Sequence, residues 1–339
     1  MKIAITADPE IPIPPNLYGG AERLIDMLIH GLVERGHKVT LFAHPESNVP
    51  CTLVPYYSNS SRGYINTVRN MMTVSRVVKS EHFDLIHSLG RLAYLIPLLP
   101  LKIPKIMTYQ REITPRSIRF GSWLSNQTLH FSSISKWMTY NVEDIVKWHL
   151  VYNGVPMKVY DFNPLVDDNA PLVFLGRIEY IKGPHLAIEI AKKANKRLII
   201  AGNISSEHQK YFNEKIMPHI DGINVTYIGP VNDIEKNILL RQAAAFLMPI
   251  LWEEPFGLVM AEAMACGTPV LGLNRGAVPE IVEHGVTGFV GNTVEELIAA
   301  TSNISFLERA DCRKRVERYF SETSNVEGYI DLYKKITIN

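Results

Sequence analysis

The feature that most constrains the fold is a regular alternation of short apolar runs and longer amphipathic segments along almost the whole chain. KIAIT (2–6), KVTLFA (38–43) and DLIHS (84–88) are each followed by a stretch with helical periodicity. Strands that are apolar throughout are buried on both faces, which is typical of a parallel sheet covered by helices. The alternation therefore predicts a doubly wound α/β structure.

The alternation is interrupted once, over residues 156–170, where no period is sustained and two prolines and an Asp pair occur. A second series of strands and helices begins at PLVFLG (171–176). Because 339 residues are too many for one small domain, we predict two Rossmann-like domains, 1–155 and 156–318, followed by a helical segment over 319–339.

Composition excludes several classes of protein. The three cysteines form no CxxC pair or Cys/His cluster, so we expect no disulfide framework and no zinc site, and a reducing cytoplasm fits best. The longest apolar run, residues 92–101, has about half of the ~20 residues that a membrane-spanning helix needs, and two prolines break it. Nothing in the sequence indicates a nucleic-acid partner.

The net charge of +1 hides an uneven distribution. Residues 1–155 carry 16 Lys and Arg against 11 Asp and Glu, whereas the remainder carries 19 against 23. A basic first half can favour an anionic acceptor or a membrane surface, but scattered solvated charge explains it equally simply.

Glycines and cations follow the first strands of both series, where ligands bind in open parallel sheets. Gly19 and Gly20 open the first long helix, and free amides at a helix start suit a phosphate, although a plain turn fits as well. Arg177 and Lys182 follow the strand at 171–176, and together they can neutralise a diphosphate without a metal. The alternative for this pair is two solvated surface charges.

The segment EEPFGLVMAEAMACGTPV (253–270) places two carboxylates eight residues apart. Glu254 precedes a predicted helix that starts near Phe256, where it can cap the helix or bind a ligand. Glu262 lies two turns deeper among small apolar residues, and a carboxylate on a packed face needs partners. Vicinal hydroxyls of a ribose or a sugar would supply them. A glycoside hydrolase also uses two carboxylates, but it needs no diphosphate clamp.

The chain resembles the family-4 retaining glycosyltransferases of the GT-B fold, which transfer a sugar from a sugar nucleotide to an acceptor. The resemblance covers nearly the whole chain and is carried by the following segments: YGGAERLIDMLIHGLVERGHKVTLFA, VYNGV, LGRIEYIKG, PILWEEPFGLVMAEAMACGTPVLG and GAVPEIVEHGVTGFV. It implies two Rossmann-like domains around a cleft, with acceptor binding in the first and sugar-nucleotide binding in the second. It also implies that the segment 319–339 packs back toward the first domain.

The resemblance implies a role for each matching residue. Glu254 would bind hydroxyls of the donor sugar, and Glu262 would hold the ribose of the nucleotide. The amides of Phe256, Gly257 and Leu258 would meet the sugar or phosphate. Arg177 and Lys182 would clamp the diphosphate, and Gly19 and Gly20 would approach it from the first domain. The substrate would be a nucleoside diphosphate sugar, UDP- or GDP-linked, with a small-molecule, glycan or lipid-linked acceptor and with neither a metal nor another cofactor.

One departure concerns the acceptor side. Where the family commonly has a histidine after the strand matching IMTY, this chain has Gln110, which can hydrogen-bond a hydroxyl but cannot titrate. His87 follows the strand DLI and would point toward the cleft, unless it is a hydrogen-bonded histidine at a strand end. In such retaining enzymes the leaving diphosphate assists the acceptor, so no protein nucleophile is expected. The rate enhancement would then come mostly from orientation of the reactants and from stabilisation of charge.

Three alternatives remain open at this point. A sugar-nucleotide epimerase would convert donor without an acceptor, a phosphorylase would need a pyridoxal-bearing lysine, and a binding protein would hold the sugar nucleotide unchanged.

A helix over 62–79 with arginines spaced by seven residues can touch a lipid surface, or it packs on the core with a solvated basic edge.

Overall fold

The computed structural model describes residues 1–15 and 19–338 and comprises two compact units. Unit 1 contains Met1–Gly154 together with Glu322–Asn339, and unit 2 contains Val155–Ser321. The domain limits expected from the sequence, after residues 155 and 318, lie within a few residues of these boundaries. The chain therefore leaves unit 1 once and returns to it with its last helix.

Unit 1 is built on a sheet of seven parallel strands in the order β3-β2-β1-β4-β5-β6-β7. Its strands are β1 (Lys2–Thr6), β2 (Lys38–Ala43), β3 (Thr52–Pro55), β4 (Leu85–Ser88), β5 (Lys105–Tyr109), β6 (Leu129–Ser133) and β7 (Trp148–Leu150). The central strands are buried on both faces, as their apolar runs predict.

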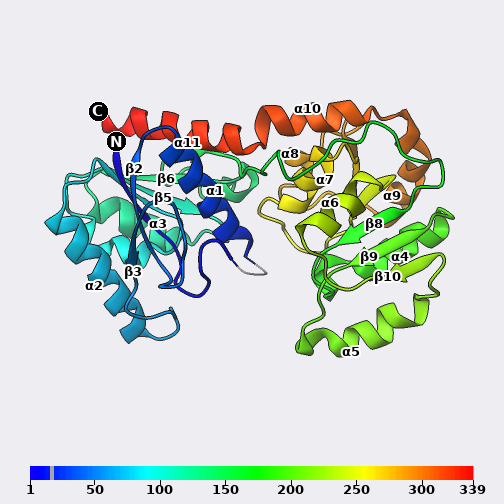
Figure 1. The fold of residues 1–339 in the computed structure, drawn as a ribbon, viewed down its shortest axis with the longest axis horizontal. Helices are drawn as coiled ribbons and strands as arrows, with labels where there is room; N and C mark the ends of the chain where they lie inside the picture. Colours follow the sequence, from blue (N-terminus) through cyan, green and yellow to red (C-terminus); the bar gives the residue numbers. More distant parts are fainter. Residues whose placement is uncertain (16–18, 339) are drawn as a thin grey trace. The chain divides into compact units, whose positions relative to one another are not determined.

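Two long helices cover one face of this sheet. They are α1 (Gly20–Glu34) and α11 (Glu322–Thr337), which lie side by side in Figure 1 and share one apolar core with β1, β2 and β4. A Cβ at Gly31 would lie 2.5 Å from the Val326 side chain, so glycine allows the two helices to pack closely. The last helix therefore belongs to the core of unit 1.

The other helices of unit 1 are α2 (Tyr64–Ser80), η1 (Leu92–Leu98), α3 (Pro115–Leu124) and η2 (Trp137–Thr139). The segment η1 contacts both α2 and α3. Figure 1 shows α2 on the far side of the sheet from α11. Right-handed crossovers place α2, η1 and α3 on one face and α1 on the other, which is the doubly wound arrangement.

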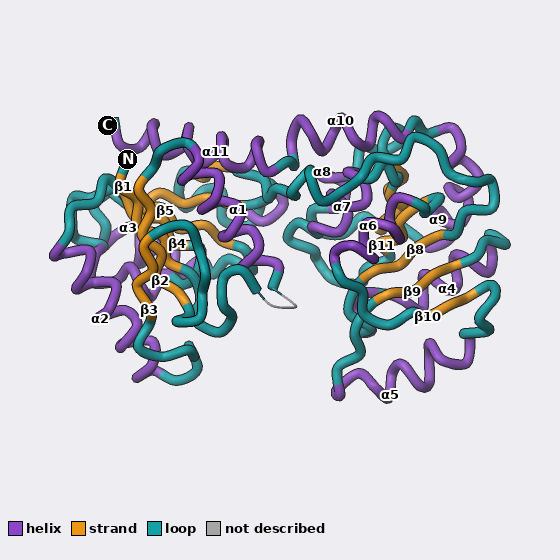
Figure 2. The backbone as a smooth tube through the Cα atoms, viewed as in Figure 1, coloured by secondary structure: helices purple, strands orange, loops and turns teal. Residues whose placement is uncertain are grey.

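Unit 2 repeats the plan with six parallel strands in the order β10-β9-β8-β11-β12-β13. Its strands are β8 (Leu172–Leu175), β9 (Leu198–Ala201), β10 (Val225–Tyr227), β11 (Ala245–Met248), β12 (Val270–Leu273) and β13 (Gly288–Gly291). Figure 2 shows both sets of strands in orange among the helices that cover them. The predicted doubly wound α/β class is confirmed in both units.

The helices of unit 2 vary in length. They are η3 (Tyr180–Lys182), α4 (Pro184–Lys193), η4 (Ser206–His208), α5 (Gln209–Tyr211), η5 (Phe212–Ile216), η6 (Met217–His219), α6 (Asp233–Arg241), α7 (Leu258–Ala265), α8 (Val278–Ile281), α9 (Val294–Ala300), η7 (Thr301–Phe306) and α10 (Arg309–Tyr319). Across the described part of the chain, none of the helices has the length and apolarity to cross a membrane.

The strand order reverses between β1 and β4 in unit 1 and between β8 and β11 in unit 2. At such a point the two neighbouring strands send their connections to opposite faces, which opens a crevice at their carboxyl ends. In unit 2 the loops after β8 and β11 carry most of the residues singled out in the sequence.

Candidate functional site

The loops after β8 and β11 are joined by backbone contacts. The amide of Leu251 donates to the carbonyl of Ile181 over 2.8 Å. Gly183 has a φ of +74°, and a Cβ there would lie 2.0 Å from the carbonyl oxygen of Pro249. Only glycine combines this conformation with this close approach. The sequence thus holds the β8 loop, which carries the predicted cations, directly against the β11 loop.

Lys182 and Glu254 meet at this junction. The Lys182 Nζ lies 2.7 Å from Glu254 Oε2, and the indole Nε1 of Trp252 donates to the same oxygen over 3.0 Å. The Lys182 ammonium also lies 4.5 Å from the centroid of the Trp252 ring. The two charged side chains are only 17% and 12% exposed, so their attraction is screened less than that of a surface pair.

Arg177 is positioned by a buried acid in the same loop. Its Nη2 lies 2.8 Å from Glu179 Oε1, and the other oxygen of Glu179 lies 3.3 Å from His208 Nε2. Glu179 is almost fully buried, whereas the Arg177 side chain is about half exposed and can reach a ligand. Glu179 was not expected from the sequence, although an acid two residues after Arg177 could have indicated an ion pair with it.

Helix α7 begins at Leu258, four residues after Glu254. Gly257 precedes it in the left-handed conformation, and no side chain caps the helix start. Phe256 is buried, with its ring 5.7 Å from that of Phe320, and so anchors the turn. The first amides of a helix and its dipole attract an anion. Leu258, the first helical residue, stands at that end of the helix.

Glu262 is embedded in α7 but is not left without partners. Its Oε1 accepts a hydrogen bond from the Tyr160 hydroxyl at 2.7 Å and from Lys236 Nζ at 2.8 Å. Burial raises the pKa of Tyr160, and the Glu262 carboxylate raises it further. A ribose ligand was inferred in part because the Glu262 carboxylate needs partners. Two protein groups, Tyr160 and Lys236, already meet that need, and neither was expected from the sequence.

A third loop, after β12, braces this region. Gly276 has a φ of +56°, and a Cβ there would lie 2.3 Å from backbone atoms of Glu254. The amide of Ala277 donates to the Glu254 carbonyl over 2.8 Å, and the Gly276 amide donates to Glu253 Oε2 over 2.5 Å. Glu253 thus holds the loop that supports its neighbour, a role that the sequence analysis did not assign.

In unit 1, Gln110 forms a reciprocal amide pair with Asn153. The Gln110 amide nitrogen donates to Asn153 Oδ1 over 3.2 Å, and the Asn153 nitrogen donates to Gln110 Oε1 over 3.0 Å. Gln110 follows β5, and Asn153 lies in the VYNGV segment after β7. The pair fixes the orientation of the Gln110 side chain at the carboxyl ends of the strands.

His87 does not lie in a position to meet a substrate. It is fully buried between β4 and α11, with Nδ1 2.7 Å from the Tyr333 hydroxyl and Nε2 2.7 Å from Thr108 Oγ1. Burial lowers the pKa of His87 to about 3, so the ring is neutral. The structure corrects the catalytic assignment of His87, because both ring nitrogens are used inside the core.

Gly19 and Gly20 stand at the start of α1, while residues 16–18 of the same segment lie outside the described residues. A Cβ at Gly19 would lie 2.7 Å from the Pro15 side chain, so the glycine is needed for packing. Gly19 therefore has a structural reason to be glycine, and the phosphate role of Gly19 and Gly20 stays a prediction.

An ionic cluster that the sequence analysis did not single out lies after β1, β4 and β5. Asp8 accepts from Arg91 Nε at 3.2 Å and from Arg111 Nη2 at 2.6 Å. The Asp8 carboxylate is largely buried, whereas Arg111 is mostly exposed. Burial raises the pKa of the nearby Glu22. The carboxyl end of the first sheet is therefore polar and charged.

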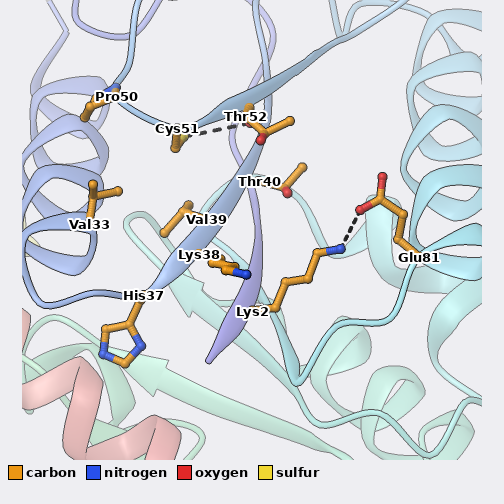
Figure 3. Close-up of a pocket in the computed structure, with 10 residues that line it drawn as sticks. All are labelled: Lys2, Val33, His37, Lys38, Val39, Thr40, Pro50, Cys51, Thr52 and Glu81. Carbon is orange, nitrogen blue, oxygen red and sulfur yellow. Dashed lines mark hydrogen bonds and ion pairs between the residues drawn. The ribbon is translucent and has the colours of Figure 1, made fainter.

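Two further features of the described residues concern metal binding and a hollow. Within residues 1–15 and 19–338, no three His, Cys, Asp or Glu side chains gather as metal ligands would. Figure 3 shows the residues that line a hollow on unit 1, which has a volume of about 390 Å³. Two of its lining residues, Lys2 and Lys38, are the first residues of β1 and β2. The hollow therefore lies at the amino ends of these strands, on the opposite edge of the sheet from the loops that follow the strands.

Comparison with known proteins agrees with this arrangement. Residues 18–159 match the model of Glycosyltransferase Family 4, and residues 160–320 match that of Glycosyl transferases group 1. The glycosyltransferase candidate YtcC of Bacillus subtilis is 25% identical, over 99% of this chain and 92% of that protein. Spore coat protein SA of the same species is 23% identical, over 94% and 93%.

Solved structures share the fold over the whole length. AviGT4, a glycosyltransferase involved in avilamycin A biosynthesis, has a TM-score of 0.74 at 23% identity, covering 100% of this chain and 98% of that one. HepE of Anabaena, solved with UDP and glucose, has a TM-score of 0.73 at 20% identity, covering 99% and 100%. The two matched families, which together span residues 18–320, and the two-sheet fold identify the chain as a glycosyltransferase of the GT-B type.

Proposed function

We propose that the protein is a retaining, metal-independent transferase that moves a sugar from a nucleoside diphosphate sugar to an acceptor hydroxyl. The observation that carries this proposal is the Lys182–Glu254 pair at the β8/β11 reversal, beside the uncapped start of α7. An ammonium, a carboxylate and helix amides there can meet a phosphate and sugar hydroxyls at the same time.

In this proposal the cations of the β8 loop bind the diphosphate. Arg177 offers a guanidinium fork and Lys182 a point charge, and the amides of Phe256, Gly257 and Leu258 add dipoles at the helix start. When the donor binds, Lys182 exchanges part of its contact with Glu254 for phosphate. Glu254 then accepts hydrogen bonds from the donor sugar.

The nucleoside would lie nearer Glu262. Tyr160 and Lys236 both bind Oε1 of this carboxylate, so we assign the ribose hydroxyls to Oε2. The bonds from Tyr160 and Lys236 hold the carboxylate in one orientation before the ribose arrives. Such preorganisation lowers the entropy cost of binding. The roles of Gly19, Gly20 and Gln110 in unit 1 stay predictions from the resemblance.

The proposed chemistry requires no protein nucleophile. The acceptor oxygen attacks the anomeric carbon on the face from which the diphosphate departs. The bond between that carbon and the phosphate oxygen breaks, and the departing phosphate takes the proton of the acceptor hydroxyl. Arg177 and Lys182 stabilise the negative charge that develops on the diphosphate, so the proposal needs no divalent metal. The protein contributes mainly orientation and this charge stabilisation.

A thermal-shift panel of sugar nucleotides in excess chelator tests the proposal. HepE was solved with UDP, so UDP-linked sugars come first and GDP-linked sugars second. A ligand at a hundred times its dissociation constant stabilises the folded state by about 2.7 kcal/mol. We expect at least one donor to raise the melting temperature of the wild type and of the control Lys193→Ala, but not of Lys182→Ala.

Two results would contradict the proposal. One is a panel in which no sugar nucleotide stabilises the wild type. The other is stabilisation that appears only when magnesium or manganese replaces the chelator. Binding without any release of sugar would favour the non-catalytic alternative.

A further inference from the structure

The ion pair that positions Arg177 extends to a second side chain, that of His208. Arg177 and Glu179 lie in the loop after β8, whereas His208 is the last residue of η4, in the connection after β9. Arg177 Nη2 lies 2.8 Å from Glu179 Oε1, and His208 Nε2 lies 3.3 Å from Glu179 Oε2. One carboxylate thus stands between an arginine that is always charged and a histidine that is charged only when it is protonated.

Hydrogen bonds to the backbone hold the loops after β8 and β9 together. The amide of Ile178 donates to the carbonyl of Asn203 over 3.0 Å, and the amide of Gly202 donates to the carbonyl of Gly229 over 2.8 Å. The Tyr227 hydroxyl also donates to the Gly202 carbonyl over 2.8 Å. The contact between the Glu179 and His208 side chains therefore joins two segments that are already fixed to one another.

Glu179 is a buried charge that depends on these two partners. The residue is 5% exposed, whereas the side chains of Arg177 and His208 are 45% and 37% exposed. A carboxylate removed from water is costly unless it is paired. Its Oε1 lies at ion-pair distance from Arg177, but it has no aligned hydrogen-bond donor among the described residues. The pair is therefore held by charge, so the guanidinium can turn toward another anion while it stays beside Glu179.

The protonation state of His208 decides how much of the Arg177 charge is available to a ligand. When the imidazole is neutral, the Glu179 carboxylate offsets mainly the charge of the guanidinium. When the imidazole is protonated, the same carboxylate is shared between two cations, and each of them is offset less. More of the guanidinium charge then acts on an anion in front of it. Protonation should therefore strengthen the binding of a diphosphate to Arg177.

We propose that Glu179 and His208 are positioning residues that make the binding of the donor diphosphate by Arg177 dependent on pH. Both act through the guanidinium and do not themselves contact the donor. The affinity for a sugar nucleotide then rises as the pH falls and His208 takes up a proton. The inference rests on the proposed function, because that function assigns Arg177 to the diphosphate.

The other titratable groups around His208 differ from it in kind or in environment. His185 of α4 stacks on Tyr180 with the ring centroids 5.0 Å apart, and its Nδ1 lies 2.6 Å from the Tyr211 hydroxyl. Burial lowers the pKa of His185, so this ring takes up a proton at a lower pH than an exposed histidine. The following charged side chains of α5 and of the loops after β8, β9 and β11 are carboxylates and ammonium groups, not imidazoles: Lys182, Glu207, Lys210, Glu253 and Glu254.

Isothermal titration of the full chain with a sugar nucleotide, between about pH 5.5 and 8, tests the inference across the ordinary histidine pKa of about 6.5. The probe is the UDP- or GDP-linked sugar that gives the largest shift in the thermal panel. Its diphosphate is esterified at both ends and so lacks the terminal phosphate proton that is lost at about pH 6. We expect the wild type to bind about three- to tenfold more tightly at the acid end of this range.

Three variants locate the effect, and one serves as a control. His208→Gln should bind at every pH with the affinity that the wild type has at the alkaline end. Glu179→Gln should lose most of the pH dependence, because no carboxylate then links the two cations. Arg177→Ala should bind weakly at every pH and lose the dependence as well. The control His219→Gln removes an exposed histidine beside Lys192, in the last turn of α4, and should keep the dependence of the wild type.

Melting temperatures of the variants are measured at each pH before the titrations. Glu179 is buried, so its variant is the one most exposed to loss of stability. If Glu179→Gln does not fold, His208→Gln and Arg177→Ala decide the question alone, because both alter side chains that are partly exposed.

Two outcomes would overturn the inference while the donor site stands. One is a donor affinity of the wild type that does not change with pH, or a change that His208→Gln retains. The other is a pH dependence that persists at full size in Arg177→Ala, which would mean that His208 acts on the donor directly. A wild type that binds no sugar nucleotide at any pH would instead overturn the proposed function, and this inference would fall with it.

Discussion

Replacing Glu254 by glutamine separates the two parts of the proposed donor site. Glutamine keeps the size of the side chain and one carbonyl oxygen that can accept from Trp252, but it removes the charge that holds Lys182 at 2.7 Å. Lys182 is then released for phosphate. A nucleoside diphosphate without sugar should therefore bind Glu254→Gln as tightly as the wild type or more tightly.

The complete donor should respond in the opposite way. If Glu254 accepts hydrogen bonds from the sugar, Glu254→Gln must make these bonds with a neutral amide in place of the charged carboxylate. Hydrogen bonds to charged groups are worth about 1.5–3 kcal/mol each, which corresponds to roughly tenfold to more than a hundredfold in affinity or turnover. The ratio of donor affinity to nucleoside diphosphate affinity should fall by that factor.

Glu262 provides the matched comparison. Glu262→Ala should weaken the nucleoside diphosphate and the full donor by similar factors, because both contain the ribose. This variant also leaves Lys236 and Tyr160 without their carboxylate, and a lone polar group that is partly buried destabilises the fold by about 1–3 kcal/mol. Its melting temperature must therefore be measured first, and titrations must be run well below it.

Isothermal titration of both variants with both ligands decides the matter. The account predicts a ligand-dependent loss for Glu254→Gln and a ligand-independent loss for Glu262→Ala. Equal losses in all four titrations, in folded protein, would refute the assignment and leave both residues as structural carboxylates.

Three further predictions rest on other residues. Arg177→Ala should weaken the bare nucleoside diphosphate, and wild-type activity should survive excess EDTA; activity that returns only with added metal would contradict the cationic clamp. Gln110→Ala should lower turnover without moving the pH optimum, measured as pH–rate profiles, since an amide does not titrate; a displaced optimum would show a coupled titrating group. The pKa of His87 is lowered from its ordinary value of about 6.5 to about 3, so the stability that the neutral ring gives is complete above pH ~6.5 and falls below it by up to about 1.4 kcal/mol per pH unit. In urea unfolding at several pH values, His87→Gln should therefore show a shallower loss of stability between about pH 6 and 4 than the wild type, and an unchanged slope would contradict this.

The central architecture could be predicted from sequence because its strands are apolar throughout. The segments KIAIT and PLVFLG predict buried parallel strands. They form β1 and β8, which both lie in the interior of their sheets. The strands that were missed, β3 (Thr52–Pro55) and β13 (Gly288–Gly291), are sheet edges. An edge strand is covered less completely, so its sequence carries a weaker apolar signal.

The candidate site could be predicted only where residues follow strands. The rule that ligands bind beyond the carboxyl ends selected Lys182 and Glu254, which the fold brings into contact. The partners Asn153, Lys236 and Tyr160 were missed because pairing between residues far apart in sequence leaves no local pattern. A position after a strand also does not determine whether a side chain points into the core.

The configuration of the released sugar tests the central claim most directly. In the absence of an acceptor, water can take its place, so the wild type is incubated in EDTA with the sugar nucleotide that stabilises it best. The anomeric proton of the released sugar is followed by NMR from the first turnover. The account predicts that the first anomer formed has the configuration of the donor and equilibrates only later. Release of the opposite anomer first, or no release from any donor that binds, would contradict a retaining transferase.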